Sequence, residues 1–314
     1  MNFYSRWVAQ KTPNYDFIRL RYIAFAVTAV LVLGSVASIA IKGFNYGIDF
    51  AGGILVEVHT VEKADLGKMR LTVDHLALGE VALQEFGTSG MDVMIRVQRQ
   101  TGDERAQMEA LSKIKTALGP GYDYRRVEIV GPKVGEELKL DGALAVALAV
   151  LAIAAYVWFR FEWQFGVGAL VAIFHDVITT FGLYSLTGME FNLTAVAAIL
   201  TIAGYSINDT VVMYDRVREN LRKYKSMSLY DLLNLSVNQT LARTILTVAT
   251  VFITVVSLLT VGGEVLRTFS IAMLWGLAVG TFSSVYVGMP ILIYFNLRTG
   301  KEKEEDERAH PAVS

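Results

Sequence analysis

The sequence contains no cysteine, so it can form no disulfide framework, thiol nucleophile or cysteine-ligated metal site. Its four histidines are far apart and form none of the short spacings that bind metals: they are His59, His75, His175 and His310. The net charge of −1 gives no indication of a nucleic-acid partner. No nucleophile–base set is apparent, so these absences argue against an enzyme, and we expect no cofactor.

Hydrophobic residues, in contrast, are abundant. They make up 53% of the 314 residues, and they gather in six stretches. Each stretch is long enough, at about 1.5 Å per residue, to cross a hydrocarbon core of roughly 30 Å. The sequence therefore predicts a polytopic α-helical membrane protein with transmembrane helices near residues 18–41, 139–159, 165–186, 192–213, 243–261 and 268–294.

The distribution of lysine and arginine predicts the orientation of these helices. If the amino terminus is cytoplasmic, the inside segments carry many basic residues, whereas the two short outside loops carry only Arg267. We therefore expect both termini, residues 1–17 and the charged tail 298–314, in the cytoplasm. The protein is then a multi-pass protein of the cytoplasmic (inner) membrane.

The long segment 42–138, between the first two helices, is then extracytoplasmic. Alternating patterns predict strands, and amphipathic patterns predict helices at 63–77 and 104–118. The resulting β-α-β-β-α-β order is typical of a ferredoxin-like domain. The four strands are expected at residues 54–59, 81–86, 92–98 and 122–130.

The remaining five helices, within 139–297, are interrupted by a cytoplasmic loop at 214–242. The second half of this loop places apolar residues on one helix face: Leu229, Leu232, Leu233, Val237 and Leu241. We predict an amphipathic helix that lies along the membrane surface.

Polar side chains interrupt the transmembrane stretches at three points. His175 and Asp176 lie midway through the third helix, Asn208 and Asp209 in the inner third of the fourth, and Arg243 at the start of the fifth. A charge at mid-bilayer costs about 2.5–3.5 kcal/mol, so such residues normally face the bundle interior and mark an ion or substrate path. His175 and Asp176 are about 100° apart on a helix. We therefore expect them to point in different directions, one of them as a packing residue.

Asp209 and Arg243 are expected at similar depth, because the fourth and fifth helices run in opposite directions. They can pair across the bundle, and a carboxylate near an arginine at low dielectric binds a proton with an affinity that depends on their separation. The pair can equally serve only to hold two helices together. The residues alone leave both interpretations open.

Small residues form faces on two of the predicted helices: Gly142, Ala145 and Ala149 on the second, Gly276 and Gly280 on the sixth. Such faces allow close helix packing. We expect them to contact a six-helix partner.

Five motifs, in order, resemble one family over about residues 15–297: "GIDFAGG", "VGPKVGEEL", "FHDV", "AGYSINDTVVMYDRVREN" and "NQTLART". The chain is similar to the SecF branch of the SecD/SecF family of bacterial protein-export membrane proteins, in the RND superfamily. The resemblance implies a heterodimer with SecD, supplied as a separate chain, and contact with the SecYEG channel, with YajC as a further candidate partner. It also implies unfolded preprotein as the substrate and the proton-motive force as the energy source, with H⁺ as the coupling ion and Na⁺ as the alternative. Asp209 and Arg243 match the family's essential aspartate and arginine.

Two other functions compete with this one. One is half of an RND-type small-molecule or lipid exporter, for which a soluble domain of this size is small. The other is a passive scaffold or chaperone without ion coupling, which protonation-dependent activity would distinguish.

The predicted topology has a direct test. Protease added to intact spheroplasts should cleave within 42–138 and leave 214–242 intact, because only the former lies outside the membrane. Cleavage of 214–242 alone would contradict both the topology and the extracytoplasmic role of the domain.

Overall fold

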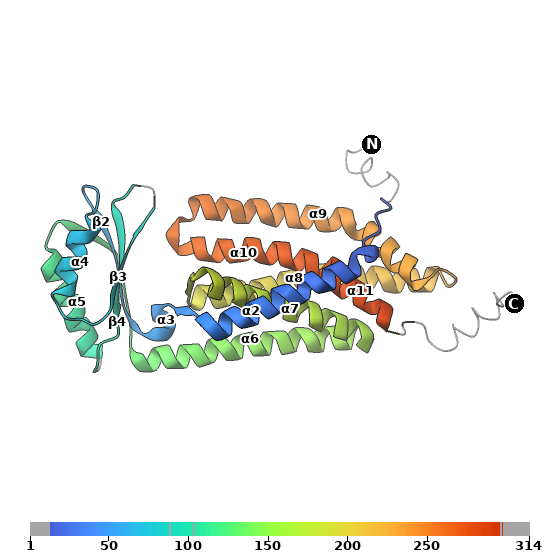
Figure 1. The fold of residues 1–314 in the computed structure, drawn as a ribbon, viewed down its shortest axis with the longest axis horizontal. Coiled ribbons are helices and arrows are strands. Elements are labelled where there is room, and N and C mark those ends of the chain that lie inside the picture. Colours follow the sequence, from blue (N-terminus) through green and yellow to red (C-terminus); the bar gives the residue numbers. More distant parts are fainter. Residues whose placement is uncertain (1–12, 88, 103, 296, 298–314) are drawn as a thin grey trace.

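Figure 1 shows the chain in a computed structural model, which describes residues 13–297 except 88, 103 and 296. Most of the predicted amino-terminal segment 1–17 and the whole charged tail 298–314 lie outside the described residues. The rest forms a long helical bundle with a sheet domain at one end (Figure 1).

Within the described part of the chain, six helices are long and apolar enough to cross a membrane. They are α2 (Arg21–Lys42), α6 (Pro132–Arg160), α7 (Trp163–Thr187), α8 (Leu193–Lys223), α9 (Leu229–Val261) and α10 (Gly263–Ser283). A 3₁₀ turn, η1 (Ile18–Leu20), precedes α2; α10 continues through η2 (Ser284–Gly288), α11 (Met289–Ile291) and η3 (Leu292–Tyr294). The prediction of a polytopic helical membrane protein is confirmed.

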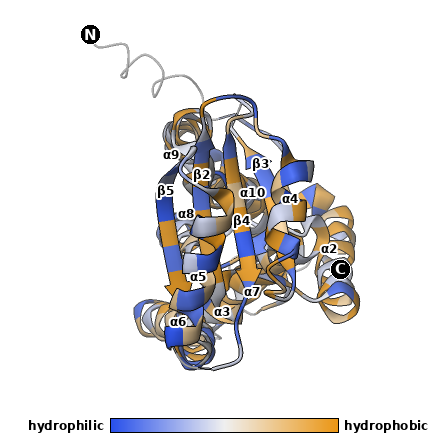
Figure 2. Cartoon of the chain, turned by 90° about the vertical axis from the view of Figure 1, so that its left-hand side faces the viewer, coloured by the Kyte–Doolittle hydropathy of each residue, from blue (hydrophilic) through white to orange (hydrophobic). Residues whose placement is uncertain are grey.

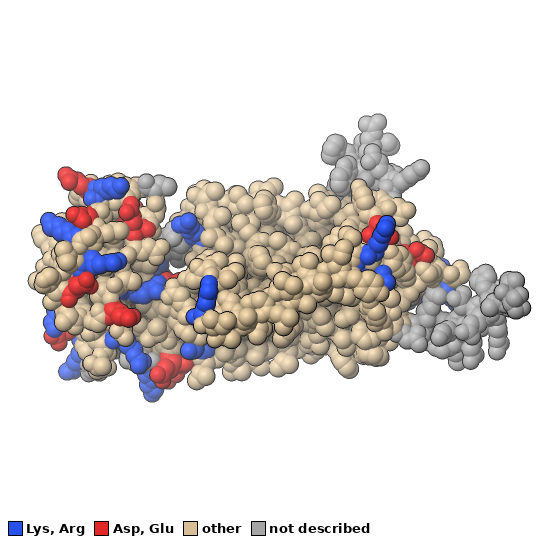
Figure 3. Space-filling model, viewed as in Figure 1, with Lys and Arg blue, Asp and Glu red and all other residues tan. Residues whose placement is uncertain are grey.

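The six helices form an inner and an outer group. At least half of the apolar stretch is buried in α7, α8 and the last helix, but only 11% in α2, α6 and α9. The outer helices expose a broad apolar surface, with charged side chains gathered at the two ends of the molecule (Figure 3). This surface is suited to lipid or to another membrane protein.

The small residues of the last helix pack inside this chain. A Cβ atom on Gly276 would lie 2.3 Å from the side chain of Ile202, and one on Gly280 would lie 3.2 Å from Ser206. The expectation that these glycines face a partner is therefore wrong, because α8 already occupies their face. On α6, Gly142 likewise packs against this chain, whereas Ala145 is exposed.

The sheet domain has the predicted β-α-β-β-α-β order. Its strands are β2 (Gly53–Thr60), β3 (Val81–Phe86), β4 (Asp92–Gln98) and β5 (Tyr122–Val130), in the spatial order β3-β4-β2-β5 with antiparallel neighbours. Helices α4 (Leu66–Asp74) and α5 (Glu104–Leu118) cover one face, against which alternate residues of β4 are buried: Val93, Ile95 and Val97. Figure 2 shows these helices in front of the sheet, and the opposite face is directed toward the membrane helices (Figure 1).

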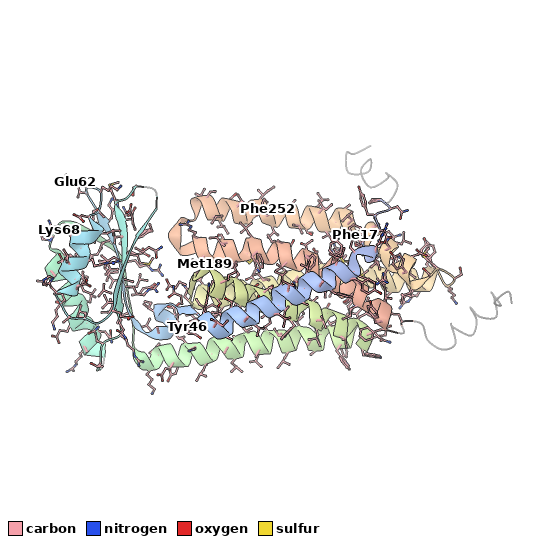
Figure 4. The ribbon with its side chains drawn as sticks, viewed as in Figure 1. Phe17, Tyr46, Glu62, Lys68, Met189 and Phe252 are labelled. Carbon is pink, nitrogen blue, oxygen red and sulfur yellow. The ribbon has the colours of Figure 1, made fainter. Side chains whose placement is uncertain are left out.

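A short connection that the sequence did not predict joins the two parts. Strand β1 (Asn45–Tyr46) pairs in parallel with β6 (Glu190–Phe191), which lies between α7 and α8. The aromatic rings of Phe44, Phe50 and Phe191 pack together beside this pair. Tyr46 and Met189 mark this end of the bundle in Figure 4. The start of the sheet domain is thus attached to the loop that leads into α8.

The prediction that residues 229–241 form a separate helix along the membrane surface is also wrong. Helix α8 extends ten residues past the expected end at 213, and α9 begins at Leu229 and runs without a break to Val261. Leu232, Leu233 and Val237 are fully buried in a cluster with Tyr214. The apolar face that suggested contact with the membrane surface instead packs against the extended end of α8.

Close packing at Gly276 gives a stability prediction. Gly276→Ala should lower the free energy of unfolding by about 1–3 kcal/mol, because the added methyl group overlaps Ile202. Gly204→Ala is the matched control, since a Cβ at Gly204 meets no atom within 4 Å and alanine favours the helix. Thermal unfolding of the purified chain in detergent measures both, and equal midpoints would contradict the packing described.

Candidate functional site

Asp209 is the most unusual polar residue of the bundle. It lies in the second half of α8, and its side chain is only 3% exposed. Its Oδ2 atom is buried and has no hydrogen-bond partner within the described part of the chain. Burying a carboxylate oxygen without a partner costs free energy. Oδ2 of Asp209 is therefore an acceptor available to a proton, a cation or a side chain that moves toward it.

Arg243 approaches this carboxylate from the neighbouring helix. It lies on α9, which packs against α8, and it attracts Asp209 electrostatically. The side-chain nitrogens of Arg243 lie more than 4.0 Å from the carboxylate oxygens of Asp209, so the two residues form no direct ion pair. Arg243 remains exposed while Asp209 is buried. The structure therefore brings the two predicted residues together without closing the pair.

Two further side chains border this gap. Thr247, one turn beyond Arg243, lies near both Asp209 and Tyr205. Its hydroxyl donates to the main-chain oxygens of Arg243 (3.1 Å) and Thr244 (3.0 Å). Among the residues that the structure describes, the Tyr205 hydroxyl is buried without a hydrogen-bond partner, as is Asp209 Oδ2. The site thus contains one unfilled acceptor and an unpaired phenol within a turn of each other on α8.

Asp176 is the opposite case, because its carboxylate is fully partnered. Its Oδ2 accepts hydrogen bonds from Ser206 of α8 (2.5 Å) and Ser283 of α10 (2.9 Å). Its Oδ1 lies 2.9 Å from Nδ1 of His175. Asp176 is fully buried and joins α7, α8 and α10. This arrangement fits a structural junction.

The expectation that His175 and Asp176 point in different directions is wrong. Both side chains are buried, and they bond to each other. The angular separation fixes only the Cα–Cβ directions, and rotation about the side-chain bonds brings the imidazole back to the carboxylate. Nε2 of His175 has no partner within the described residues.

The other predicted polar residue, Asn208, is exposed on α8 and belongs to neither group. Three further buried polar residues were not predicted from the sequence: Ser283 and the hydrogen-bonded pair of Thr210 and Ser284 (2.8 Å). Serines and threonines occur throughout such helices, so the residue type alone does not predict which of them form hydrogen bonds. Only the packing of the helices shows which hydroxyl groups are in contact.

The outer end of α8 is also fixed by polar contacts. Asp49, in "GIDFAGG", accepts a hydrogen bond from the main-chain nitrogen of Leu193 (2.9 Å), the first residue of α8. A carboxylate at this position also favours the positive end of the helix dipole. Asp49 therefore fixes the first residue of the fourth membrane helix.

Beside this contact, Glu190 of β6 forms an ion pair with Arg96 of β4. Burial raises the pKa of Glu190 above its usual range, while Arg96 acts in the opposite direction and nearby Asp49 adds to the rise. Asp49 and Glu190 together connect the sheet domain to α8, the helix that carries Asp209.

No cluster of three or more histidine, aspartate or glutamate side chains that could hold a metal ion occurs among the residues that the structure describes.

Comparison with known proteins is consistent with this arrangement. Residues 110–298 match the family model described as protein export membrane protein SecD/SecF, C-terminal, and residues 37–64 match the SecD/SecF GG motif. The chain is 43% identical over 307 residues to the protein translocase subunit SecF of Rickettsia felis and 44% identical to that of Rickettsia rickettsii. Each alignment covers 96% of this chain and 99% of the relative.

Among solved structures, SecDF from Thermus thermophilus, a translocon-associated membrane protein, matches with a TM-score of 0.80 and 34% identity over 91% of this chain. SecDF in its super-membrane-facing form matches with a TM-score of 0.66 and 33% identity over 95% of this chain. The chain spans only 39% and 40% of those two solved chains. The sequence identities and the matched models establish that this chain belongs to the SecD/SecF family of protein export membrane proteins.

Proposed function

We propose that this chain is the SecF-type subunit of an accessory complex that uses the proton-motive force to assist preprotein translocation. The named relatives over nearly their full length support the subunit assignment. The solved SecDF chains are more than twice as long, whereas the SecF relatives are matched over 99% of their own length, which supports a separate SecD-type partner. SecYEG is the channel it would serve, with YajC as a further candidate partner.

One observation carries the ion-coupling part of the proposal: Asp209 is buried, Arg243 is near, and the two are not in contact. When ionised, Asp209 attracts Arg243 and favours closure of the gap between α8 and α9. When it holds a proton, that attraction disappears and the helices are free to separate. The chain would thus have two helix arrangements, and the proton occupancy of one carboxyl oxygen would select between them.

The available energy is sufficient for such a rearrangement. Each charge that crosses the membrane potential releases about 2.3 kcal/mol per 100 mV. One or a few protons therefore offset a domain movement of several kcal/mol. Na⁺ is the alternative coupling ion at the same carboxylate.

The contacts at the outer end of α8 provide a route from this site to the sheet domain. Asp49 holds the first residue of α8, and Glu190 beside it binds Arg96 of the sheet. A shift or tilt of α8 at Asp209 would therefore also move the points where the sheet domain is attached. We place the sheet domain on the outer side of the inner membrane, where it meets emerging unfolded preprotein, and both termini in the cytoplasm.

Replacing Asp209 tests the proposal. Asp209→Asn keeps the size of the side chain but cannot cycle between charged and neutral forms, so the whole gradient-dependent increment of preprotein translocation should be lost. Arg243→Lys keeps the charge without the planar guanidinium and should also be impaired. The assay is translocation into inverted vesicles that contain the SecD-type partner, with and without a proton gradient.

Asp215→Asn is the matched control, because this carboxylate lies on the same helix but is exposed at the surface. It should respond to the gradient as the wild type does. ATP-driven translocation without a gradient should be equal in all variants. A normal gradient response in Asp209→Asn would show that the Asp209 carboxylate only holds helices together.

A further inference from the structure

A second polar site lies at the end of the bundle opposite the sheet domain. A cavity of about 750 Å³ is bounded by the end of α6, the last turns of α8 and the first half of α9. Six of the residues that line it are basic: Arg160, Arg216, Arg218, Arg222, Lys223 and Arg243. The predicted ion path uses only the last of these, so the others need a separate explanation.

Acidic residues do not neutralise this cavity. Its two carboxylates are already engaged: Asp215 binds Arg160 (3.1 Å) and Glu219 binds Arg216 (2.8 Å). Outside the lining, Glu162 lies 3.8 Å from Arg218. Arg222 and Lys223 form no ion pair with any residue that the structure describes. The cavity is therefore strongly positive, and an anion would find unpaired donors there.

The donors are of the kinds that bind phosphate. Guanidinium groups contact two phosphate oxygens at once, and an ammonium group adds a point charge. Gln239 also lines the cavity; its Oε1 accepts a hydrogen bond from Asn220 (2.8 Å), which leaves its NH₂ group as a donor. A neutral ligand would leave this positive charge uncompensated.

The position of the cavity indicates the source of the phosphate. Arg160 is the last residue of the membrane-spanning helix α6, and it pairs with Asp215, just past the expected membrane end of α8, so this part of the cavity lies at headgroup depth. The residues just before Arg160 include large exposed aromatics: Trp158 is 59% exposed and Phe159 is 94% exposed. Exposed aromatic residues are typical of the membrane–water interface, where acyl chains would pass beside them.

We propose that this cavity binds the headgroup phosphate of an anionic phospholipid, with the acyl chains along the exposed surface of α6. This inference depends on the membrane-spanning helices and not on the proposed ion coupling. Arg243 lines the cavity and also attracts Asp209, so a bound phosphate and the carboxylate are alternative partners for one guanidinium.

Lipid binding can be measured by native mass spectrometry of the full chain in detergent, titrated with phosphatidylglycerol or with phosphatidylcholine. The wild type should retain phosphatidylglycerol in preference to phosphatidylcholine. Arg222→Gln should weaken that binding about fivefold and the double variant Arg222→Gln, Lys223→Gln about 30-fold, from the usual contribution of one basic residue near a membrane surface. Arg222→Lys should restore most of the affinity.

Arg19→Gln is the control, because Arg19 is exposed at the same end of the bundle but does not line the cavity. It should bind as the wild type does. Equal retention of the two lipids by the wild type would overturn the proposal, and so would unchanged binding in the double variant. Displacement of the lipid by millimolar inorganic phosphate would show that a soluble phosphate is the ligand and would overturn the lipid assignment. Thermal unfolding midpoints identify any variant that fails to fold. In that case, lipid binding by Arg222→Lys is compared with that of the wild type instead.

Discussion

The interior of a membrane helix bundle offers no water, so each buried polar group must find its partners within the protein. Asp176 meets this requirement through His175, Ser206 and Ser283, and in doing so it joins three helices. Asp209, three residues after Ser206 on α8, does not, because one of its carboxylate oxygens has no partner in the described structure. Asp176, whose carboxylate has all its partners, therefore fits a structural junction, whereas Asp209, whose carboxylate does not, is the candidate ion site. The sequence alone does not distinguish these two buried aspartates.

Helix α8 connects the features of the molecule that bear on function. Its first residue is held by Asp49, its middle packs on Gly276 and Gly280 and bonds to Asp176, and its second half carries Asp209. Its last turns line the basic cavity. A single continuous helix thus extends from the sheet domain to the opposite end of the bundle. On the proposed function, this continuity is what allows one proton to influence a domain at the far end of the helix.

Periodicity and length were sufficient to predict the six long helices and the order of the sheet domain, because alternation and apolar runs report burial directly. They could not predict the β1–β6 pair, whose strands are two residues long and lie far apart in sequence. The segment 229–241 was misassigned because an amphipathic face has the same pattern whether it meets lipid or another helix. The glycines of the last helix were misassigned for the same reason. The sequence was sufficient to identify Asp209 and Arg243, but only the packing of α8 and α9 shows that they lie close together without forming a direct pair.

The proposed function requires Asp209 to take up and release a proton inside the bundle. Infrared difference spectroscopy of the chain in lipid bilayers tests it directly, since protonated and ionised carboxyl groups absorb at different frequencies. A carboxylic acid band should titrate with pH, disappear in Asp209→Asn and persist when the exposed Asp215 is changed to asparagine. If the wild type has no titrating band that depends on Asp209, the carboxylate does not exchange protons and the proposed proton coupling is contradicted.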